Sequence, residues 1–293
     1  MEDHRRLFGT SGIRGVFGQD LTIDFCREVA QATATMLGSH SKVCIGTDTR
    51  VSRETVKDAV ISGLRSAGTD VTDLGILPTP ALAFLTRDMG FHTGIMITAS
   101  HNPPEFNGIK LFNGNAIGYN EAQEVKIEKI FNEKRFSTGC SGNLSRAHGA
   151  KGRYFRFLQD NFTTKDLNLN LRLVIDSGNG AASRFATELF AGMGFEVMPL
   201  NDEPDGLFPN RSPEPRDDTL RGTIDFLRKS EADIAICSDG VTDRVVFCDK
   251  DGFLGFNEPI AFISRCEVNE FIAKAVATTV EAGRVLDLAL EDL

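Results

Sequence analysis

A short segment rich in hydroxyl and imidazole groups follows an apolar stretch just before residue 100. Residues 98–103 read Thr-Ala-Ser-His-Asn-Pro and come directly after the apolar run 94–97. An apolar run closed by proline and glycine predicts a buried strand leading into a loop, and α/β sheets place their reactive groups at such strand ends. We therefore expect Ser100 to act as a nucleophile. His101 beside it can transfer protons near neutral pH, or it can anchor the loop by hydrogen bonding.

An ordinary turn is the simpler interpretation of an isolated Ser-His pair, because Thr98, Ser100 and Asn102 are residue types that hydrogen-bond to their own backbone in many loops. Three other segments argue against that interpretation. They read Phe-Gly-Thr-Ser-Gly-Ile-Arg-Gly at 8–15, Asn-Gly-Ile-Lys at 107–110 and Asp-Gly-Val-Thr-Asp-Arg at 239–244. With residues 98–103 they resemble the α-D-phosphohexomutase family, whose members move a phosphoryl group between the 1- and 6-oxygens of a hexose. The resemblance runs through essentially the whole chain.

The resemblance implies a phosphoserine and a metal site. In the family the serine of this motif carries a phosphoryl group, and it corresponds to Ser100. The aspartates of an Asp-Gly-Asp-x-Asp-Arg loop bind Mg²⁺ together with that phosphate, so the implied metal ligands are Ser100, Asp239 and Asp243. Val241 stands where the family has the middle aspartate. Mg²⁺ prefers a near-octahedral set of oxygen ligands, and a water would have to replace the lost carboxylate, so we expect weakened metal binding.

Basic and polar residues of the other segments are expected to contact the ligand. Lys110 and Arg14 are the candidate cations on the transferring phosphoryl group, and the matching residues of the family line the same cleft. Taken alone, each has a plainer interpretation, as a solvated lysine beside a strand or as an arginine paired with a surface carboxylate. We assign Thr10, Ser11 and Arg244 to substrate binding.

A glycine-rich turn at 177–180 leaves two interpretations open. Its sequence, Ser-Gly-Asn-Gly, lies between an apolar strand and a helix, where backbone N–H groups can cradle an anion. A tight turn at the junction of a strand and a helix is the simpler interpretation.

Composition excludes several classes of protein. The 293 residues carry a net charge of −9, which disfavours nucleic acid, because its binding requires clustered Lys and Arg. A small anionic phosphosugar is still compatible, since it responds to local charge inside a cleft. The six cysteines are scattered without a C-x-x-C pair, which is typical of reduced thiols. With neither a membrane-spanning stretch nor a signal peptide, we expect a cytoplasmic protein with no membrane partner.

Three segments share one pattern of apolar strand, turn and amphipathic helix. In the first, strand 42–46 precedes a helix that Ser52 opens, and a second strand begins in 67–71. In the second, strand 173–175 precedes a helix through Phe185, Leu189 and Phe190, and a strand begins in 194–197. The third begins with a strand at 276–280 and ends in a helix with the apolar stripe Val285, Leu286, Ala289, Leu290 and Leu293. Its returning strand is missing.

This alternation predicts an α/β fold with mixed, mostly parallel sheets flanked by helices in tandem domains. We expect a first domain at 1–150 with the phosphoserine loop, a second at 155–253 with the metal loop, and the start of an incomplete third at 254–293. The polar segment 137–152 is the expected link. Because the terminal apolar stripe lacks its partner strand, self-association through this helix is expected.

The function implied by the resemblance is that of a phosphohexomutase. Phosphate would move between the 1- and 6-positions of a glucose, mannose or glucosamine phosphate through a phosphoserine and a hexose 1,6-bisphosphate intermediate. The implied cofactors are Mg²⁺ and hexose 1,6-bisphosphate as activator. The alternative is a catalytically impaired, truncated remnant that binds a phosphosugar or a partner chain. A dinucleotide-binding protein is disfavoured because no G-x-G-x-x-G motif follows a predicted strand.

Overall fold

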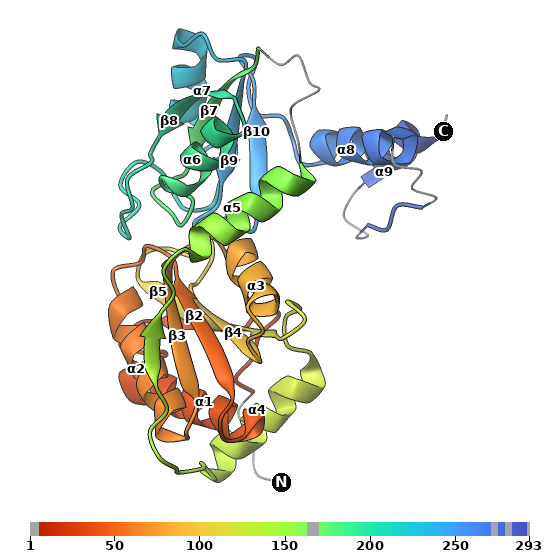
Figure 1. The fold of residues 1–293 in the computed structure, drawn as a ribbon. Coiled ribbons are helices and arrows are strands. Elements are labelled where there is room, and N and C mark those ends of the chain that lie inside the picture. The colour runs from red at the N-terminus through yellow and green to blue at the C-terminus, as the bar shows by residue number, and fades with distance from the viewer. Residues whose placement is uncertain (1–5, 163–169, 271–274, 279–282, 292–293) are drawn as a thin grey trace.

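Two α/β units make up most of the protein (Figure 1). The computed structural model describes residues 6–162, 170–270, 275–278 and 283–291. The first unit is built on a six-stranded sheet and the second on a four-stranded sheet. The helix α5 (Ala150–Asn161) runs across the boundary between the units, as Figure 1 shows. The predicted α/β fold with mixed, mostly parallel sheets is confirmed.

The first sheet has the strand order β1-β5-β4-β2-β3-β6. Its strands are β1 (Ile13–Val16), β2 (Lys42–Thr47), β3 (Asp70–Ile76), β4 (Thr93–Ile97), β5 (Phe106–Asn113) and β6 (Leu144–Arg146). The pairs β4-β2, β2-β3 and β3-β6 are parallel, whereas β5 runs antiparallel to both β4 and β1. This arrangement brings the end of β4, where the serine segment begins, next to β5 and β1.

Helices cover both faces of the first sheet. They are α1 (Ile23–Leu37), α2 (Arg53–Ser66), α3 (Thr79–Asp88) and α4 (Glu121–Glu133). Residues of β2 alternate between the two faces: Val43 and Ile45 join the apolar cluster with α1, α2 and α4, whereas Cys44 joins the cluster with α3. Such alternation is expected of a strand that is buried on both sides.

The second sheet has the strand order β10-β9-β7-β8. Its strands are β7 (Arg172–Asp176), β8 (Glu196–Leu200), β9 (Ile234–Ser238) and β10 (Val245–Cys248), and its helices are α6 (Phe185–Gly192) and α7 (Arg221–Lys229). Strand β7 is parallel to both β8 and β9, and only β10 is antiparallel to its neighbour. The first two strand-helix-strand repeats expected from the sequence are therefore present, one in each unit.

The two units meet where β4 and β9 end. The Thr49 hydroxyl donates to the Asn179 carbonyl oxygen at 2.9 Å, and the backbone N–H of Thr79 donates to the Val241 carbonyl oxygen at 3.0 Å. Gly240 lies so close to the serine segment that a Cβ there would be 2.7 Å from the Ser100 carbonyl oxygen. Only glycine permits this approach of the two backbones.

Two expectations about segment boundaries need correction. The segment 137–152 is not simply a link, because its residues 144–146 form β6 at the edge of the first sheet and α5 begins at Ala150. Of the strand expected at 276–280, residues 276–278 adopt no strand, and residues 279–280 lie outside the described part. A strand needs a neighbour for its backbone hydrogen bonds, and none lies beside these residues in the part of the chain that is described. The domain bounds remain a prediction.

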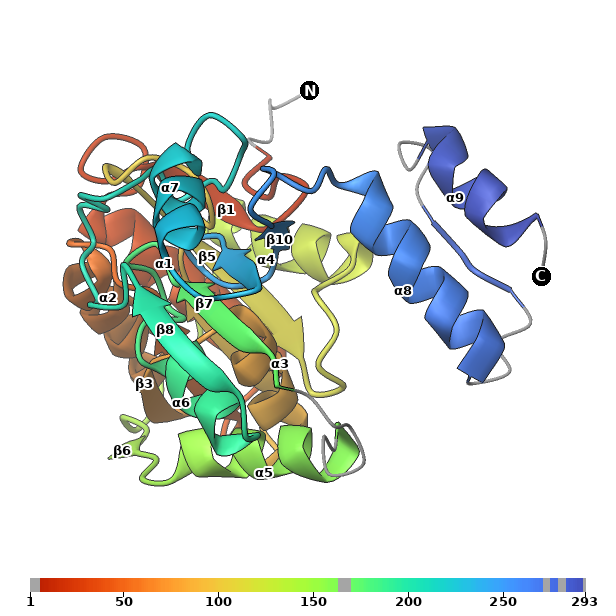
Figure 2. The same ribbon diagram turned by 90° about the horizontal axis from the view of Figure 1, so that it is seen from above.

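Two helices project away from the sheets at the C-terminal side. Figures 1 and 2 show α8 (Asn257–Glu270), which the sequence pattern did not predict, side by side with α9 (Gly283–Leu290). Leu286 of the predicted apolar stripe is buried against Ala261 of α8, so this stripe is partly covered. Leu293 lies outside the described residues. The exposed large apolar side chains of this region lie on both helices or just before α8: Phe256, Ile260, Phe262, Ile263, Val285 and Leu288.

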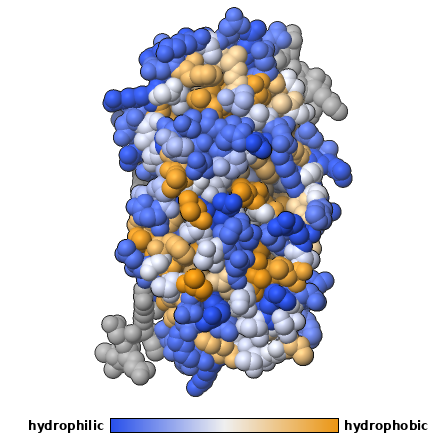
Figure 3. Space-filling model, turned by 90° about the vertical axis from the view of Figure 1, so that its left-hand side faces the viewer, coloured by the Kyte–Doolittle hydropathy of each residue, from blue (hydrophilic) through white to orange (hydrophobic). Residues whose placement is uncertain are grey.

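The apolar surface and the length of the helices can be compared with what a membrane-spanning protein requires. On the face drawn in Figure 3, most apolar groups are small and separated by hydrophilic ones. Among the described residues, no helix is long and apolar enough to span a bilayer.

Candidate functional site

Ser100 lies at the boundary between the two units, directly after β4. The residue is only 2% exposed, and its backbone has a φ of 55°, a left-handed conformation that non-glycine residues rarely adopt. The hydroxyl donates to Asp239 Oδ2 at 2.9 Å and reaches Asp243 Oδ1 at 3.4 Å. Both aspartates belong to the loop after β9 in the second unit. The structure therefore brings together the serine and the two aspartates expected at the site.

The serine segment is held by a buried arginine that sequence reasoning missed. Arg50 follows β2 and is fully buried. Its guanidinium donates to Asp48 Oδ2 and to backbone carbonyl oxygens within the segment from Ser100 to Phe106. Thr98 completes the link, because its hydroxyl donates to Asp48 Oδ2 at 2.6 Å and accepts the Ser100 N–H at 2.8 Å. The available signal was an Asp-Thr-Arg sequence at the end of the strand next to β4.

The two aspartates are electrostatically unlike. Burial, with the negative charge of Asp243, raises the pKa of Asp239 to about 6. Burial also acts to raise the pKa of Asp243, but the charge and hydrogen bond of Lys110 outweigh it and lower that pKa. Lys110 Nζ lies 2.7 Å from Asp243 Oδ2. Pairs of carboxyl groups whose pKa values are pushed apart are common where one must accept a proton and the other must stay charged.

Lys110 and Arg14 come from the adjacent antiparallel strands β5 and β1, and they share one face of the sheet because Arg14 pairs with Gly108, two residues before Lys110. Arg14 Nη1 donates to Asn102 Oδ1 at 3.1 Å. Its Nε atom is buried and has no hydrogen-bond partner in the described residues. Burial, followed by the nearby cations, lowers the pKa of Arg14, although a guanidinium stays protonated at neutral pH. This cation retains donor capacity for a ligand.

His101 lies half-buried beside the serine, with its Nδ1 atom buried and unpaired among the described residues. Burial and the positive charge of Arg244 lower the pKa of His101, so the ring is neutral at neutral pH. The loop is held by Arg50 and Thr98, whose hydrogen bonds to its backbone do not involve the His101 ring. Both roles expected for His101, proton transfer and anchoring of the loop, therefore stay predictions.

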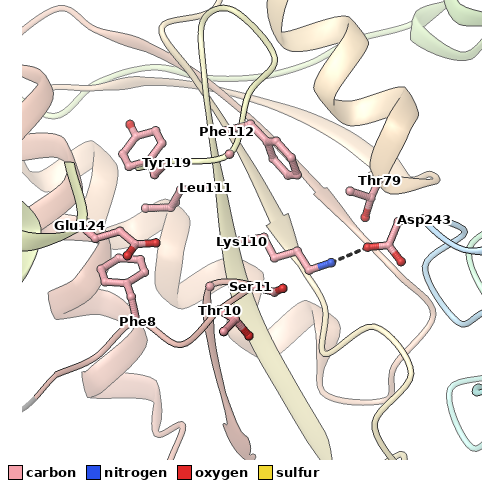
Figure 4. A pocket seen from close by; sticks show the side chains of 12 residues that line it. Phe8, Thr10, Ser11, Thr79, Lys110, Leu111, Phe112, Tyr119, Glu124 and Asp243 are labelled. Carbon is pink, nitrogen blue, oxygen red and sulfur yellow. Dashed lines mark hydrogen bonds and ion pairs between the residues drawn. The ribbon is translucent and has the colours of Figure 1, made fainter. Parts of the chain in front are cut away.

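A pocket of about 330 Å³ opens beside Lys110 and Asp243 (Figure 4). Thr10 and Ser11 line it together with Lys110. Aromatic and acidic side chains line the pocket as well: Phe8, Phe112, Tyr119 and Glu124. Arg244 does not line this pocket and is half-exposed, with its guanidinium 3.7 Å from Asp239 Oδ2. The residues assigned to substrate therefore flank the Ser100 site from both units.

The donor set suits a divalent cation only in part. Two carboxylates converge on the Ser100 hydroxyl, and their mutual repulsion is one cause of the raised Asp239 pKa. A cation would relieve that repulsion, and a phosphorylated Ser100 would add oxygen ligands. Val241, however, is fully buried in the apolar cluster that includes Leu82 of α3 and Phe185 of α6. In the described ranges, no group of three His, Cys, Asp or Glu side chains is placed to hold a metal.

The glycine-rich turn at 177–180 is a tight turn. The N–H of Gly178 donates to Asp176 Oδ1, and that of Gly180 donates to the Ser177 carbonyl oxygen. The N–H groups of Ser177 and Asn179 donate to carbonyl oxygens of Leu200 and Asn201. Because these donors are already used within the protein, the turn does not cradle an anion.

Sequence comparison relates both units to known domains. Residues 5–138 match the family model of phosphoglucomutase/phosphomannomutase α/β/α domain I, and residues 152–252 match that of α/β/α domain II. A probable phosphoglucosamine mutase of Methanothermobacter thermautotrophicus is 39% identical over 294 residues, which cover 99% of this chain and 64% of that protein. A phosphoglucomutase/phosphomannomutase of Thermococcus kodakarensis is 34% identical over 290 residues, covering 96% of this chain and 64% of that protein. The chain thus spans somewhat less than two thirds of the length of these relatives.

Solved structures agree with this relationship. A phosphoglucomutase/phosphomannomutase family protein from Burkholderia thailandensis superposes with a TM-score of 0.83 at 29% identity, covering 97% of this chain and 64% of that one. A putative phosphomannomutase from Thermus thermophilus gives a TM-score of 0.80 at 28% identity, covering 90% and 61%.

Proposed function

Because the chain belongs to the phosphoglucomutase/phosphomannomutase family, we propose that it carries a phosphoryl group on Ser100 and exchanges it with a hexose phosphate. The observation that carries the proposal is the Ser100 hydroxyl bonded to Asp239 Oδ2 at 2.9 Å, beside the Lys110–Asp243 ion pair. A hydroxyl, a base and a cation at one buried point are what phosphoryl transfer to or from a serine requires.

Loading of the serine begins with hexose 1,6-bisphosphate. Ser100 Oγ attacks the phosphorus of one phosphoryl group, the bond between that phosphorus and the sugar oxygen breaks, and the sugar oxygen takes up a proton from water. The proton of the Ser100 hydroxyl passes to Asp239, whose Oδ2 already accepts this hydroxyl at 2.9 Å and whose pKa is about 6 when no metal is bound. In the productive direction the steps reverse, and the phosphoryl group moves from Ser100 to the free hydroxyl of a hexose monophosphate.

The cations supply the charge stabilisation. Lys110, buried beside Asp243, can turn its ammonium toward the phosphoryl oxygens, and Arg14 has an unpaired donor on the same side. Such preorganised donors stabilise charge in the transition state far better inside a protein than in water. Arg244 would contact the ligand from the second unit.

Asp239 and Asp243, with oxygens of a phosphorylated Ser100, would hold Mg²⁺. When bound, Mg²⁺ would neutralise the phosphate and carboxylate charges. With Val241 in the buried cluster, the protein supplies two carboxylates rather than three. We therefore keep the expectation of weak metal binding.

Substrates of the hexose or hexosamine monophosphate class follow from the relatives, whose names include phosphoglucosamine mutase and phosphoglucomutase/phosphomannomutase. Hexose 1,6-bisphosphate would serve as activator by loading Ser100. All six cysteines are free, which supports a reducing compartment such as the cytoplasm.

A coupled mutase assay with glucose, mannose and glucosamine phosphates tests the proposal. The wild-type chain should interconvert the 1- and 6-phosphates of at least one sugar, Ser100→Ala should abolish this, and the exposed Ser137→Ala should not. Equal activity of wild type and Ser100→Ala would contradict the proposal. Activity in neither would favour the impaired binding protein.

A further inference from the structure

A buried aspartate–arginine pair holds the serine loop (98–106) in the first unit, and a second such pair holds the aspartate loop (238–244) in the second unit. In the first unit, Asp48 follows β2, and Arg50 reaches from it to the Ser100 carbonyl oxygen at 2.9 Å. In the second unit, Asp176 ends β7, the strand that pairs in parallel with β9. Arg211 donates to Asp176 Oδ2 at 3.0 Å and to the Ser238 carbonyl oxygen at 2.7 Å.

The two aspartate–arginine pairs occupy equivalent places in the topology of their sheets. Strands β2 and β4 are parallel neighbours, as are β7 and β9, and in each pair the aspartate belongs to one strand end and the reactive loop to the other. Arg50 follows its aspartate by 2 residues, whereas Arg211 follows its aspartate by 35, and both arginines are almost completely buried. The buried arginine therefore serves the same geometric purpose in both units although it comes from different places in the chain.

Each arginine uses almost all of its guanidinium nitrogens as hydrogen-bond donors in holding its loop. Arg50 also donates to the carbonyl oxygens of Asn102, Pro103 and Phe106, so every guanidinium nitrogen is bonded. Arg211 also donates to the carbonyl oxygens of Asp176 and Ser212. A lysine has one nitrogen and no planar fork, so it cannot make these bonds at once.

Both carboxylates are fixed in turn. Asp48 accepts the Thr98 hydroxyl, and Asp176 accepts the Thr223 hydroxyl as well as the Asn201 amide. Buried ion pairs satisfied in this way are rigid, because breaking one partner leaves an uncompensated charge. The position of each loop relative to its sheet is therefore fixed from the backbone side.

We propose that Arg50 and Arg211 are paired positioning residues, which set the separation between the Ser100 hydroxyl and the Asp239 carboxylate. Arg50 fixes the backbone of Ser100, and Arg211 fixes the residue before Asp239. Since the two loops come from different units, the 2.9 Å contact between them needs both. Misplacement of reacting groups by an ångström is enough to cost about 100-fold in rate. The kinetic part of this inference rests on the proposed phosphoryl transfer.

The test measures single-turnover phosphorylation of Ser100 by glucose 1,6-bisphosphate in Arg50→Lys and Arg211→Lys. Both should lower the rate at saturating donor by about 10- to 100-fold while changing the half-saturating donor concentration little, since neither arginine touches the donor. Lys57→Met is the matched control, because it breaks a buried ion pair with Asp73 that contacts neither loop. If the lysine variants do not fold, Thr98→Val and Thr223→Val replace them. These substitutions remove the hydroxyls that donate to Asp48 and Asp176, the aspartates of the two pairs.

Hydrogen exchange separates this inference from the proposed function. Arg50→Lys should raise amide exchange selectively in 98–106, and Arg211→Lys in 238–244, whether or not the chain is phosphorylated. The inference would be overturned if both arginine variants were phosphorylated at the wild-type rate and showed unchanged amide exchange. It would also be overturned if Lys57→Met lowered the phosphorylation rate as much as the arginine variants do. If the wild-type chain takes up no phosphate, the proposed function fails, and the exchange result alone decides the positioning role.

Discussion

The hydroxyl of Ser100 donates to Asp239 Oδ2 at 2.9 Å, although the two residues are 139 positions apart and lie in loops that follow strands of different sheets. This bond joins the end of β4 to the end of β9, and it can exist only because Gly240 allows the two loops to approach. The candidate nucleophile and its candidate base are thus already in hydrogen-bond contact.

Replacing Asp239 by asparagine should stabilise the protein at pH 8 in the absence of metal while abolishing phosphoryl transfer. The folded-state pKa of Asp239, about 6, exceeds its ordinary value of 3.8, so the folded state binds more protons than the unfolded state between these values. Stability from this group is therefore greatest at low pH, falls as pH rises from about 4 to 6, and stays low above 6. The Asp239→Asn substitution would remove that loss, which amounts to about 1–3 kcal/mol.

Denaturant unfolding of wild type and Asp239→Asn from pH 4 to 8, in EDTA, measures this difference. The opposite contribution of Asp243, whose pKa is lowered, falls in a separate window below pH 4. An asparagine variant that is no more stable than wild type at pH 8 would contradict the expected cost of ionised Asp239.

Val241→Asp should bind Mg²⁺ more tightly than wild type, by about tenfold or more, because a third carboxylate adds ligand charge. The same change should destabilise the metal-free protein by several kcal/mol, since Val241 is fully buried in an apolar cluster. Calorimetric titration of Mg²⁺ into both proteins measures the affinity. Val241→Asn, which has the shape of the aspartate variant without its charge, is the control. Equal affinities of wild type and Val241→Asp would refute the idea.

Lys110→Met should slow Ser100 phosphorylation by about 100-fold or more, because it removes a buried cation beside the transferring group. Lys110→Arg should retain part of the rate. Quench-flow measurement with labelled glucose 1,6-bisphosphate gives these rates, and Lys134→Met, which breaks an exposed ion pair with Glu28, should be unaffected. A Lys110→Met protein that is phosphorylated at the wild-type rate would exclude Lys110 from the reaction.

Self-association of the chain is expected to involve α8 rather than the α9 stripe. Phe262 is 70% exposed, whereas in the stripe Leu286 is 4% and Val285 is 40% exposed. Phe262→Ser should therefore weaken concentration-dependent association measured by sedimentation velocity. Val51→Ser removes a similarly exposed apolar side chain from the first unit and should have no effect. A wild-type chain that stays monomeric at high concentration would contradict this expectation.

Features that depend on residues close together in the sequence could be predicted, whereas features that depend on contacts between distant segments could not. Apolar periodicity predicted β2, α2 and β7, since their buried faces repeat locally. The motifs predicted Ser100, Asp239, Asp243 and Lys110, which the structure brings together. Burial of Arg50 and Arg211 was not predictable in the same way, because a basic residue at a strand end is usually solvated, and only the neighbouring strand supplies its acceptors. The helix α8 was missed because its large apolar residues Ile260, Phe262 and Ile263 are consecutive or nearly so and do not recur at helical spacing over the length of the helix.

The burial of Val241 also could not be predicted from the sequence. A valine in a metal loop indicates a lost ligand, but its packing against α3 and α6 depends on how the two units meet. The Asp-Gly-Val-Thr-Asp loop therefore contributes both to the candidate site and to the contact between the units.

Mass spectrometry of the intact chain after incubation with glucose 1,6-bisphosphate shows whether Ser100 accepts a phosphoryl group. We expect the added mass of one phosphoryl group, located by fragmentation to Ser100 and absent from Ser100→Ala. An unmodified wild-type chain, or a phosphoryl group found on another residue, would contradict the proposed role of Ser100.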